Sequence, residues 1–461
     1  MPPAIVWFRQ DLRLADHAAL TAALEGGTPV IPVYILDDEA AGAWAMGGAS
    51  RWWLHGSLAA LGGALEACGA GLVLRRGRAA DILPELQRET GAGAIHAGRM
   101  HEPWGRAQEA AMPGLTLHRT ATLFDLGSIT TKTGGTYGVY GPFARACRAR
   151  AAPPAPLPAP KRIACPTLPR SDRLADWGLL PTHPDWAGGF RETWQPGEDA
   201  AHARLHAFYE KSVQGYNRGR NLPGEPGTSM ISPHLHWGEL SPAQVWHTGL
   251  AAAERTGAGL DTFLGEILWR EFSAYLLWHR PHMPEQPLRA AFAQLANRDD
   301  PAGLARWQRG QTGIPIVDAG LRQLWHIGWM HNRVRMIAAS FLVKNLLIAW
   351  QQGENWFWDT LVDADLASNA ASWQWIAGSG IDSQPFFRVF NPVSQGETWD
   401  PDGAYVRRWV PELAGLPAKY VHRPWAAPDG PPPGYPAPMA DLAASRARAL
   451  AAYRAAVRPQ D

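Results

Sequence analysis

The sequence is poor in cysteine, has no long apolar run and carries almost no excess of either charge. Its 461 residues include three cysteines, and no two of them form a CxxC pair. This usage is typical of a reduced compartment and provides neither a disulfide framework nor a cysteine zinc site. No run of eighteen apolar residues occurs, and the opening AIVWF lacks the layout of a signal peptide. We therefore expect a cytoplasmic protein without a membrane span.

The charge balance and the absence of several catalytic motifs argue against some classes of function. Lys and Arg together number 43 against 42 Asp and Glu, so the formal net charge is only +1. A protein that coats nucleic acid through bulk charge would be strongly basic, although a local basic patch is compatible with this balance. Because the sequence contains no HExxH, nucleophile elbow or Walker loop, hydrolytic and phosphoryl-transfer chemistry are poorly supported.

Two weaker motifs favour structural interpretations. GAGAIHAG (91–98) only partly resembles a glycine-rich nucleotide loop, and it precedes an expected strand where such a loop should follow one. A turn at the entry to a sheet is the preferred interpretation. His234 and His236 have no carboxylate or thiol at ligand spacing, so a solvated loop is preferred to a metal site. We expect no metal ion.

The chain is too long for one hydrophobic core and suggests two domains. Short apolar runs alternate with helical stretches in residues 1–130, which predicts an α/β domain with a parallel, Rossmann-like sheet and flanking helices. Residues 131–199 are rich in proline and are expected to form an extended linker. Helix-period segments dominate residues 200–461, which predicts an all-α domain. The expected helices are 198–215, 241–255, 259–279, 316–350, 356–375 and 440–457.

The stretch from Gly328 to Pro392 contains an unusual polar stripe. Asp365, Asn369 and Trp373 are spaced four residues apart, so an unbroken helix would place them on one face. A soluble helix normally turns an apolar stripe toward its core. A carboxylate, an amide and an indole in that position suit a bound polar aromatic molecule better than a plain core.

Two other helical faces combine polar and aromatic residues. Glu266, Trp269 and Arg270 share one face, which fits either a surface salt bridge or a pocket wall with a ring for a base and an arginine for phosphate. Asn332 and Met336 form a similar face, and the arginines between them are placed to reach a phosphate or a carboxylate.

A compact turn precedes one of the expected helices. Tyr216 and Arg220 are followed by GTSMIS (227–232), in which two hydroxyls and several backbone N–H groups arrive together. Such a turn fits either a phosphate or pyrophosphate cradle or an ordinary helix cap.

These segments occur together in one order along the chain. GTSMISPHL, ILWREF, GQTGIPIVDAGLRQL, GWMHNRVRM, LVDADLASNAASWQW and FFRVFNPVSQGE all fall within residues 216–413. With WFRQDLRLADHAAL (7–20) and YVRRWVPEL (405–413), they resemble the DNA photolyase and cryptochrome family, and most closely its class I cyclobutane pyrimidine dimer photolyases. The ordered set of motifs is highly specific. It implies that the helical domain binds FAD.

The resemblance implies an FAD site residue by residue. Asp363 would pair with Arg335 near the flavin ring, and Asp365 would accept a hydrogen bond from an N–H of that ring. Asn369 falls beside flavin N5, where a neutral amide accepts a hydrogen bond without adding negative charge. Plant-type cryptochromes carry an acid there, which favours repair over signalling. The resemblance also implies that Tyr216 and Ala364 bind FAD. It further implies that a turn near the FAD phosphates is formed by Thr228, Ser229, Met230, Ile231 and Ser232.

The same resemblance implies a site for a DNA lesion. Glu266, Asn332 and Met336 match residues that dimer photolyases bring to the lesion, and Trp269 and Trp375 would flank the flipped dimer. Enzymes for the 6-4 photoproduct carry histidines where Asn332 and Met336 stand, so a cyclobutane dimer is the expected substrate. The expected DNA-binding residues are Arg220, Trp269, Arg270, Asn332, Arg333, Arg388 and Gln395.

The chain departs from the family pattern in its electron relay. Trp373 and Trp350 match two relay tryptophans, but the third position falls on Asn297. Asparagine cannot carry a radical at an accessible potential. Either Trp307 or Trp325 ends the relay, or photoreduction is slow.

A second departure concerns the antenna. Folate-binding members have a glutamate that aligns near Gly105, and the EPWGR segment here is more similar to members that bind a deazaflavin or a second flavin. The resemblance therefore implies a deazaflavin or flavin antenna rather than folate, with an empty pocket as the alternative. The segment also fits an ordinary surface helix beginning at Pro103.

We predict an enzyme, a carbon–carbon lyase in which excited, reduced FAD donates an electron to a flipped cyclobutane pyrimidine dimer. The expected partner is UV-damaged DNA, and the protein is expected to be a monomer that does not contact membranes. A cryptochrome-like flavin photoreceptor without repair activity is the alternative. A dark flavin oxidoreductase would need a nicotinamide site, and the sequence shows none.

Overall fold

The computed structural model describes residues 1–383 and 387–457, with the backbone alone for 253–256. Two compact units make up the chain. Unit 1 comprises Met1–Gln214, Ser229–Pro281 and Val362–Asp365, and unit 2 comprises Gly215–Thr228, His282–Leu361 and Leu366–Asp461. The domain boundaries predicted at residues 130 and 199 stay a prediction.

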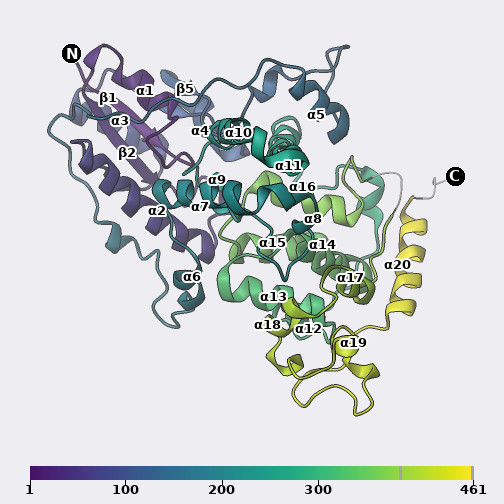
Figure 1. Ribbon diagram of the computed structural model, residues 1–461. Coiled ribbons are helices and arrows are strands. Elements are labelled where there is room, and N and C mark those ends of the chain that lie inside the picture. Colours follow the sequence, from purple (N-terminus) through teal and green to yellow (C-terminus); the bar gives the residue numbers. More distant parts are fainter. Residues whose placement is uncertain (384–386, 458–461) are drawn as a thin grey trace. The chain divides into compact units, whose positions relative to one another are not determined.

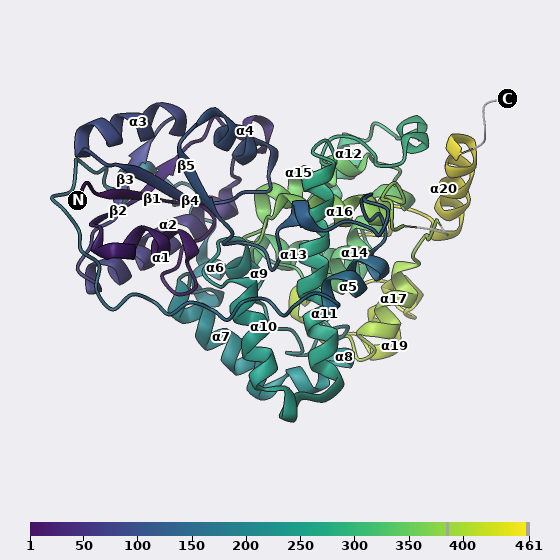
Figure 2. The ribbon, with the colours of Figure 1, turned by 90° about the horizontal axis from the view of Figure 1, so that it is seen from above.

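A five-stranded parallel sheet forms the first part of unit 1. Its strand order is β3-β2-β1-β4-β5. Figure 2 shows α1 and α2 on one side of the sheet and α3 and α4 on the other. The predicted α/β architecture is confirmed. The strands are β1 (Ala4–Phe8), β2 (Val30–Leu36), β3 (Val73–Arg76), β4 (Ala94–Gly98) and β5 (Leu115–His118), and the helices are α1 (Ala18–Leu24), α2 (Gly48–Ala67), α3 (Ala79–Thr90) and α4 (Pro103–Ala111).

The central strands are almost wholly apolar because helices cover both of their faces. Every residue of β1 and β2 is buried. Ile5, Ile31 and Val33 are fully buried in one cluster with Leu83 of α3. GAGAIHAG spans the end of α3 and all of β4, with Gly91 left-handed at φ 67°. The interpretation of that motif as a sheet-entry turn is therefore confirmed.

The remainder of unit 1 is helical. Ser241 begins α10 with a reciprocal capping box, in which its hydroxyl accepts from the Gln244 N–H and Gln244 accepts from the Ser241 N–H. The helix α5 packs on α11. These helices are α5 (Tyr140–Arg148), α6 (Gly188–Thr193), α7 (Glu198–Lys211), α9 (Ser232–His236), α10 (Pro242–Ala251) and α11 (Ala253–His279) (Figure 1).

Unit 2 consists of helices and turns. Among them α14 packs against both α13 and α16, and α15 packs against α16. The helices are α8 (Tyr216–Gly219), α12 (Pro301–Gln308), α13 (Pro315–Ile327), α14 (Asn332–Ser340), α15 (Trp350–Thr360), α16 (Leu366–Ala377), α17 (Pro392–Trp399), α18 (Ala404–Trp409), α19 (Ala418–Val421) and α20 (Leu442–Val457). The last of these confirms the predicted C-terminal helix.

Two of the predicted long helices are wrong. The segment 316–350 divides because Gly328 ends α13 in a left-handed conformation at φ 67°, a conformation that glycine adopts without steric cost. After α14 the chain widens into a π-helical turn at Phe341–Asn345, and Leu347 has φ 55°. The segment 356–375 divides at Leu361–Asp365, between α15 and α16. Asp365 therefore precedes the helix that carries Asn369 and Trp373.

The GQTGIPIVDAG motif is a buried cap at the start of α13. The Asp318 carboxylate accepts from Thr312 N at 2.6 Å, Thr312 Oγ1 at 2.7 Å and Gly313 N at 3.0 Å. Tyr435, from the Pro-rich segment near the C-terminus, donates its hydroxyl to the same carboxylate at 2.7 Å. Asp318 is completely buried. The motif thus joins a helix start to a segment more than a hundred residues away.

None of the described helices is long and apolar enough to span a membrane, in agreement with the sequence.

Candidate active site

In unit 1, the two predicted flavin carboxylates lie in an irregular segment. Asp363 and Asp365 are buried, at 9% and 7% exposure, and the Trp237 indole donates to Val362 O beside them. Burial alone would raise the pKa of Asp365, but the imidazoles of His101 and His236 and the charge of Arg270 outweigh it and hold the pKa well below its ordinary value. An ionised carboxylate accepts a hydrogen bond from a ring N–H more strongly than a neutral carboxyl group does.

The histidines His234 and His236 are not in a solvated loop, and that prediction is wrong. Both are buried in α9. His234 Nδ1 lies 2.5 Å from the Glu239 carboxylate, which is a contact that the sequence spacing did not suggest. His236 Nδ1 lies 4.0 Å from Asp365 Oδ2. Sequence spacing could not indicate this second contact, because the partners are 129 positions apart.

The predicted pocket wall lies on α11, although its members have different surroundings. Glu266, Trp269 and Arg270 are all half-buried. Trp269 stacks on Tyr140 of α5, with ring centroids 3.7 Å apart and planes 8° from parallel. Sequence reasoning missed Tyr140, which also donates its hydroxyl to Gly265 O. One face of the Trp269 indole is therefore covered by Tyr140.

The Arg270 side chain forms hydrogen bonds with backbone carbonyl groups of unit 1. Its two terminal nitrogens donate to Ala121 O at 2.9 Å and Leu235 O at 3.2 Å, and its charge lowers the pKa of Asp365. This arrangement differs from the exposed phosphate-binding arginine that the sequence suggested. The assignment of Arg270 to DNA stays a prediction, and its observed contacts favour a structural role.

The predicted phosphate turn is irregular and partly accessible. Thr228, Ser229 and Met230 are half-buried, Ile231 is buried and Ser232 begins α9. Met230 has φ 51°, one of three non-glycine residues in the described part of the chain with a left-handed backbone. A non-glycine residue in that region is held there by its surroundings.

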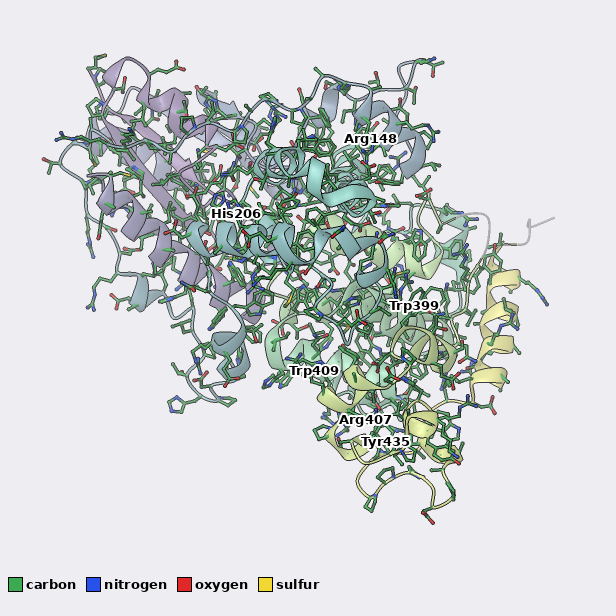
Figure 3. The ribbon with its side chains drawn as sticks, viewed as in Figure 1. Arg148, His206, Trp399, Arg407, Trp409 and Tyr435 are labelled. Carbon is green, nitrogen blue, oxygen red and sulfur yellow. The ribbon has the colours of Figure 1, made fainter. Side chains whose placement is uncertain are left out.

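In unit 2, several predicted side chains come together around α14. His331 caps the N-terminus of the helix, and burial, followed by the charges of Arg333, Arg335 and Arg220, lowers its pKa to about 3. Arg333 donates to the Asn221 side chain and lies over the Trp399 ring at 4.6 Å. The Trp399 side chain is labelled in Figure 3. A group of cations is therefore concentrated here in a protein with nearly no net charge.

The remaining predicted residues of this region are close to that group. The Arg220 guanidinium lies 5.6 Å from the Tyr216 ring, and Tyr216 is buried. Met336 accepts a weak contact from Arg333 at 3.9 Å. Asn332 is exposed at the first turn of α14. The structure thus places an amide, a thioether and three arginines in one neighbourhood of unit 2.

Trp375 and Arg388 line one cavity of unit 2. Lys344 lines it as well, and its ammonium donates to Arg388 O. Burial, and next the charge of Arg388, lower the pKa of Lys344 to about 7. Gln395 accepts from the Trp399 indole at 3.3 Å on α17. The sequence predicted Trp375 and Arg388 but gave no reason to select Lys344.

Asn369 is buried and has a defined orientation. Its Nδ2 donates to Glu354 O on α15 at 3.1 Å. The side-chain oxygen is consequently the atom presented as an acceptor, as the predicted contact to flavin N5 requires. The contact joins α15 to α16, so the orientation of the amide depends on the packing of those two helices.

Glu354 is a buried acid that sequence reasoning missed. It has no exposed surface, and neither carboxyl oxygen has a hydrogen-bond partner among the described residues. Burial, with a smaller contribution from the charge of Glu285, raises its pKa well above 4.5. The available signal was its spacing, because Glu354 lies one helical turn after Trp350.

Replacing Glu354 by glutamine is expected to alter how stability depends on pH. In the unfolded chain, Glu354 loses its proton once the pH exceeds the ordinary pKa of a glutamate. In the folded protein the raised pKa keeps that proton bound. Glu354 therefore destabilises the folded state increasingly as the pH rises from the unfolded pKa toward the folded pKa. Glutamine has no such proton. The difference in Tm between Glu354→Gln and the parent should grow in favour of the variant as the pH rises above 4.5, the ordinary pKa of this carboxyl group. A difference that is constant with pH would show that Glu354 is ionised when folded.

Trp373, the first member of the predicted tryptophan relay, lies in the core of unit 2. Trp373 is 2% exposed, and its ring centroid lies 5.0 Å from Phe357 and 6.3 Å from Trp307. A Cβ on Gly353 would lie 2.2 Å from the Trp373 ring, so the indole fits only against a glycine. Trp350, the first residue of α15, is also buried.

The proposed ends of the relay differ in exposure. Asn297, at the predicted third position of the relay, is exposed. Trp307 is completely buried and donates its indole N–H to Ala338 O. Trp325 is 56% exposed and stacks on Trp356 at 5.9 Å, with planes 2° apart. Trp307 is therefore in ring contact with the relay, whereas Trp325 is accessible to a reductant.

The start of α4 and the surroundings of Gly105 are relevant to the predicted antenna chromophore. Pro103 is the first residue of α4, so the predicted helix start is confirmed. A Cβ on Gly105 would lie 2.6 Å from Met100 Cβ, which leaves no space for a glutamate without a shift of that segment. A glutamate at position 105, near which the glutamate of folate-binding members is expected to align, would therefore clash with Met100.

Comparison with known proteins agrees with these observations. The family model for the FAD binding domain of DNA photolyase matches residues 263–455, and the model for DNA photolyase matches residues 4–161. The chain is 50% identical over 471 residues to the deoxyribodipyrimidine photo-lyase of Agrobacterium fabrum, with 98% of each chain covered.

Two solved structures are also similar. A bacterial class III photolyase from Agrobacterium tumefaciens has a TM-score of 0.95 and 48% identity, covering 99% of this chain and 98% of its own. An archaeal photolyase from Sulfolobus tokodaii with two FAD molecules has a TM-score of 0.84 and 26% identity, covering 98% and 100%. The resemblance stated from the sequence is confirmed at the level of the family, while its class I assignment is unsupported. The chain belongs to the DNA photolyase family.

Proposed function

We propose that this chain is a deoxyribodipyrimidine photo-lyase that uses light and reduced FAD to repair cyclobutane pyrimidine dimers in DNA. The photo-lyase relative that is 50% identical along the whole chain supports this function. The single structural observation that carries it is Asn369, a buried neutral amide whose nitrogen is held by Glu354 O. A cryptochrome-like photoreceptor is the less favoured function because the resemblance expects an acid at that position.

The residues present fit a flavin. Asp365 is held as an ionised acceptor and Asn369 presents an oxygen, which match a ring N–H and a protonated N5. The hydroxyls of Thr228, Ser229 and Ser232 are proposed to contact the phosphates, with Tyr216 and Arg335 as further FAD contacts. When bound and reduced, FAD would supply, after absorbing light, the electron whose transfer to the dimer opens the cyclobutane ring.

The chain's own residues orient the substrate and exclude water. We assign Glu266 to the pyrimidine edges, and Trp269 and Trp375 to the faces of the flipped dimer. Because Tyr140 already covers one face of Trp269, a base has only the opposite face available. Asn332 and Met336 complete the proposed lesion contacts, and Arg220, Arg333, Arg388 and Gln395 are assigned to the DNA backbone.

The subclass assignment changes from that made on sequence. We assign the chain to class III rather than class I, because the similar solved structure with 48% identity is a class III photolyase. For the antenna we propose a second flavin or deazaflavin. This choice is supported by the similar archaeal photolyase with two FAD molecules and by the steric closure at Gly105. Monomeric state and cytoplasmic location stay predictions.

Repair is tested with purified, reduced protein and a thymine-dimer oligonucleotide. We expect illumination to restore thymine absorbance, with no change in the dark or in protein freed of FAD. If FAD is bound and light restores no absorbance, the repair function is refuted. Light-induced flavin reduction in that same sample would then favour the photoreceptor.

Trp307 is expected to act as a branch of the relay. Its ring contact with Trp373 predicts that Trp307→Phe slows photoreduction of oxidised FAD by about fivefold, or about 1 kcal/mol in barrier. Asn297→Trp should accelerate the same reaction by restoring an exposed terminal ring. Blue-light bleaching of oxidised flavin in the presence of a thiol measures both rates. If Trp325→Phe slows the reaction and Trp307→Phe does not, the relay ends at Trp325.

A further inference from the structure

A cluster of ionisable side chains is buried around Asp365 in unit 1. His101 and Glu102 come from the segment between β4 and α4, His236 comes from α9, and Arg270 comes from α11. His101 Nε2 lies 3.4 Å from Glu102 Oε1 and 3.9 Å from Asp365 Oδ2. The side chains of His101, Glu102 and Asp365 are 5%, 1% and 9% exposed. His101 therefore stands between two carboxylates, out of contact with bulk water.

Several polar atoms of the cluster have no conventional hydrogen bond. Within the described part of the chain, His101 Nε2 and both carboxyl oxygens of Glu102 lack a partner at hydrogen-bond geometry. Such atoms are costly to bury unless charge interactions compensate. The compensation available here is electrostatic attraction at 3.4 to 3.9 Å across a poorly solvated space.

The charges of the cluster indicate which side chain compensates the second carboxylate. With Glu102 and Asp365 counted as two negative charges and Arg270 as one positive charge, one carboxylate needs an imidazolium, at either His101 or His236. Of these two, His101 lies within 4 Å of both carboxylates, whereas His236 is recorded only against Asp365. An imidazolium at His101 would make the cluster neutral. Burial lowers the pKa of His101, but the charges of Glu102 and Asp365 outweigh burial and raise it. The direction of that shift agrees with the count.

A bound divalent cation is the competing explanation. His101, Glu102 and Asp365 each offer one ligand atom, and these atoms lie within 4.8 Å of one another. Ligand atoms around a tetrahedral zinc lie about 3.3 to 3.6 Å apart, given bonds of about 2.0 to 2.2 Å. The His101–Asp365 and His236–Asp365 separations of 3.9 and 4.0 Å exceed that spacing, and the Arg270 charge would repel a cation. The geometry therefore favours a proton over a metal.

We propose that His101 is a positioning residue: as an imidazolium between Glu102 and Asp365, it keeps Asp365 ionised for the flavin and sets the electrostatic balance that favours the reduced, anionic cofactor. The inference rests on the proposed function, because it requires Asp365 to face FAD. Glu102 has the complementary role of holding the imidazolium. Neither residue was selected from the sequence.

Opposite charge changes test this assignment in the FAD-loaded protein. His101→Gln removes a positive charge, so the ratio of reduced to oxidised flavin at a fixed potential should fall about tenfold, or about 30 mV for a two-electron couple. Glu102→Gln removes a negative charge and should raise the ratio by a similar factor. The double variant restores the charge balance and should return the ratio close to that of the parent. Redox titration followed by flavin absorbance measures all four proteins.

The opposite signs separate an electrostatic role from a structural one. Damage to packing would move both single variants in one direction, and the double variant would be worse than either. If His101→Gln fails to fold, the rise expected for Glu102→Gln still decides the matter. His282→Gln serves as the control, because the His282 side chain is 75% exposed and pairs with Glu285 outside the cluster.

Three results would overturn the proposal. The first is an unchanged ratio of reduced to oxidised flavin in both single variants, and the second is a shift of the same sign in both. The third is one equivalent of zinc bound to the parent and lost in His101→Gln, which would assign the cluster to a metal. The repair assay on the parent protein separates this failure from that of the proposed function. A parent that repairs dimers while the variants show no opposite shifts retains its function and loses only the role of His101.

Discussion

Trp373→Phe should slow the photoreduction of oxidised FAD by at least about 100-fold, which corresponds to about 2.7 kcal/mol in barrier. Trp373 is almost completely buried, and its indole contacts Trp307 and Phe357. Phenylalanine at 373 is much harder to oxidise than an indole, so the first transfer to the flavin would lose its donor. The rate is measured as the loss of oxidised-flavin absorbance under blue light with a thiol reductant.

The same variant separates photoreduction from repair. Repair requires reduced flavin and not the relay, so chemically reduced Trp373→Phe should repair dimers as the parent does. Trp425→Phe is the matched control, because Trp425 is 38% exposed near the C-terminus and has no ring contact with Trp373 among the described residues. Photoreduction at the parent rate in Trp373→Phe would exclude this tryptophan as the first donor.

The second large effect concerns stability. Asp318→Ala should lower the free energy of unfolding by about 4 kcal/mol, because donors left without a partner cost about 1 to 3 kcal/mol each. The carboxylate accepts from Thr312 N, Thr312 Oγ1, Gly313 N and the Tyr435 hydroxyl, and it is completely buried. Urea unfolding followed by far-UV circular dichroism measures the change.

Tyr435→Phe provides the graded control for Asp318. It removes one of the donors and leaves the other three in place, so it should cost about 1 kcal/mol. A cost for Asp318→Ala no larger than that for Tyr435→Phe would show that the other three hydrogen bonds add little. The GQTGIPIVDAG motif would then need a functional explanation in place of a structural one.

The sequence predicted the α/β part of the fold more accurately than the helical part. Strands such as Ala4–Phe8 are continuous apolar runs between turn signals, which makes their type and limits easy to read. Helix limits in unit 2 depend on single residues in unusual conformations. Gly328 at φ 67° and Leu347 at φ 55° interrupt a segment whose apolar periodicity continues through them.

Some residues of the candidate site could be predicted from the sequence, and others could not. Local spacing and motif resemblance identified Asn369, Trp373 and Asp365. They did not identify Glu354, which receives its importance from a backbone contact to Asn369 on another helix. Tyr140 and His101 were also missed, because their partners Trp269 and Asp365 are 129 and 264 positions away. Such contacts arise from tertiary packing and leave no periodic signal in one sequence.

The close approach of Gly353 to Trp373 has an evolutionary consequence. The indole occupies the volume in which any side chain at 353 would begin, and the two residues belong to neighbouring helices, α15 and α16. Position 353 is therefore closed to mutation for as long as position 373 keeps its large ring. A lineage that abandoned this relay would first shrink residue 373 and only then gain freedom at 353. The two positions should consequently change in a fixed order.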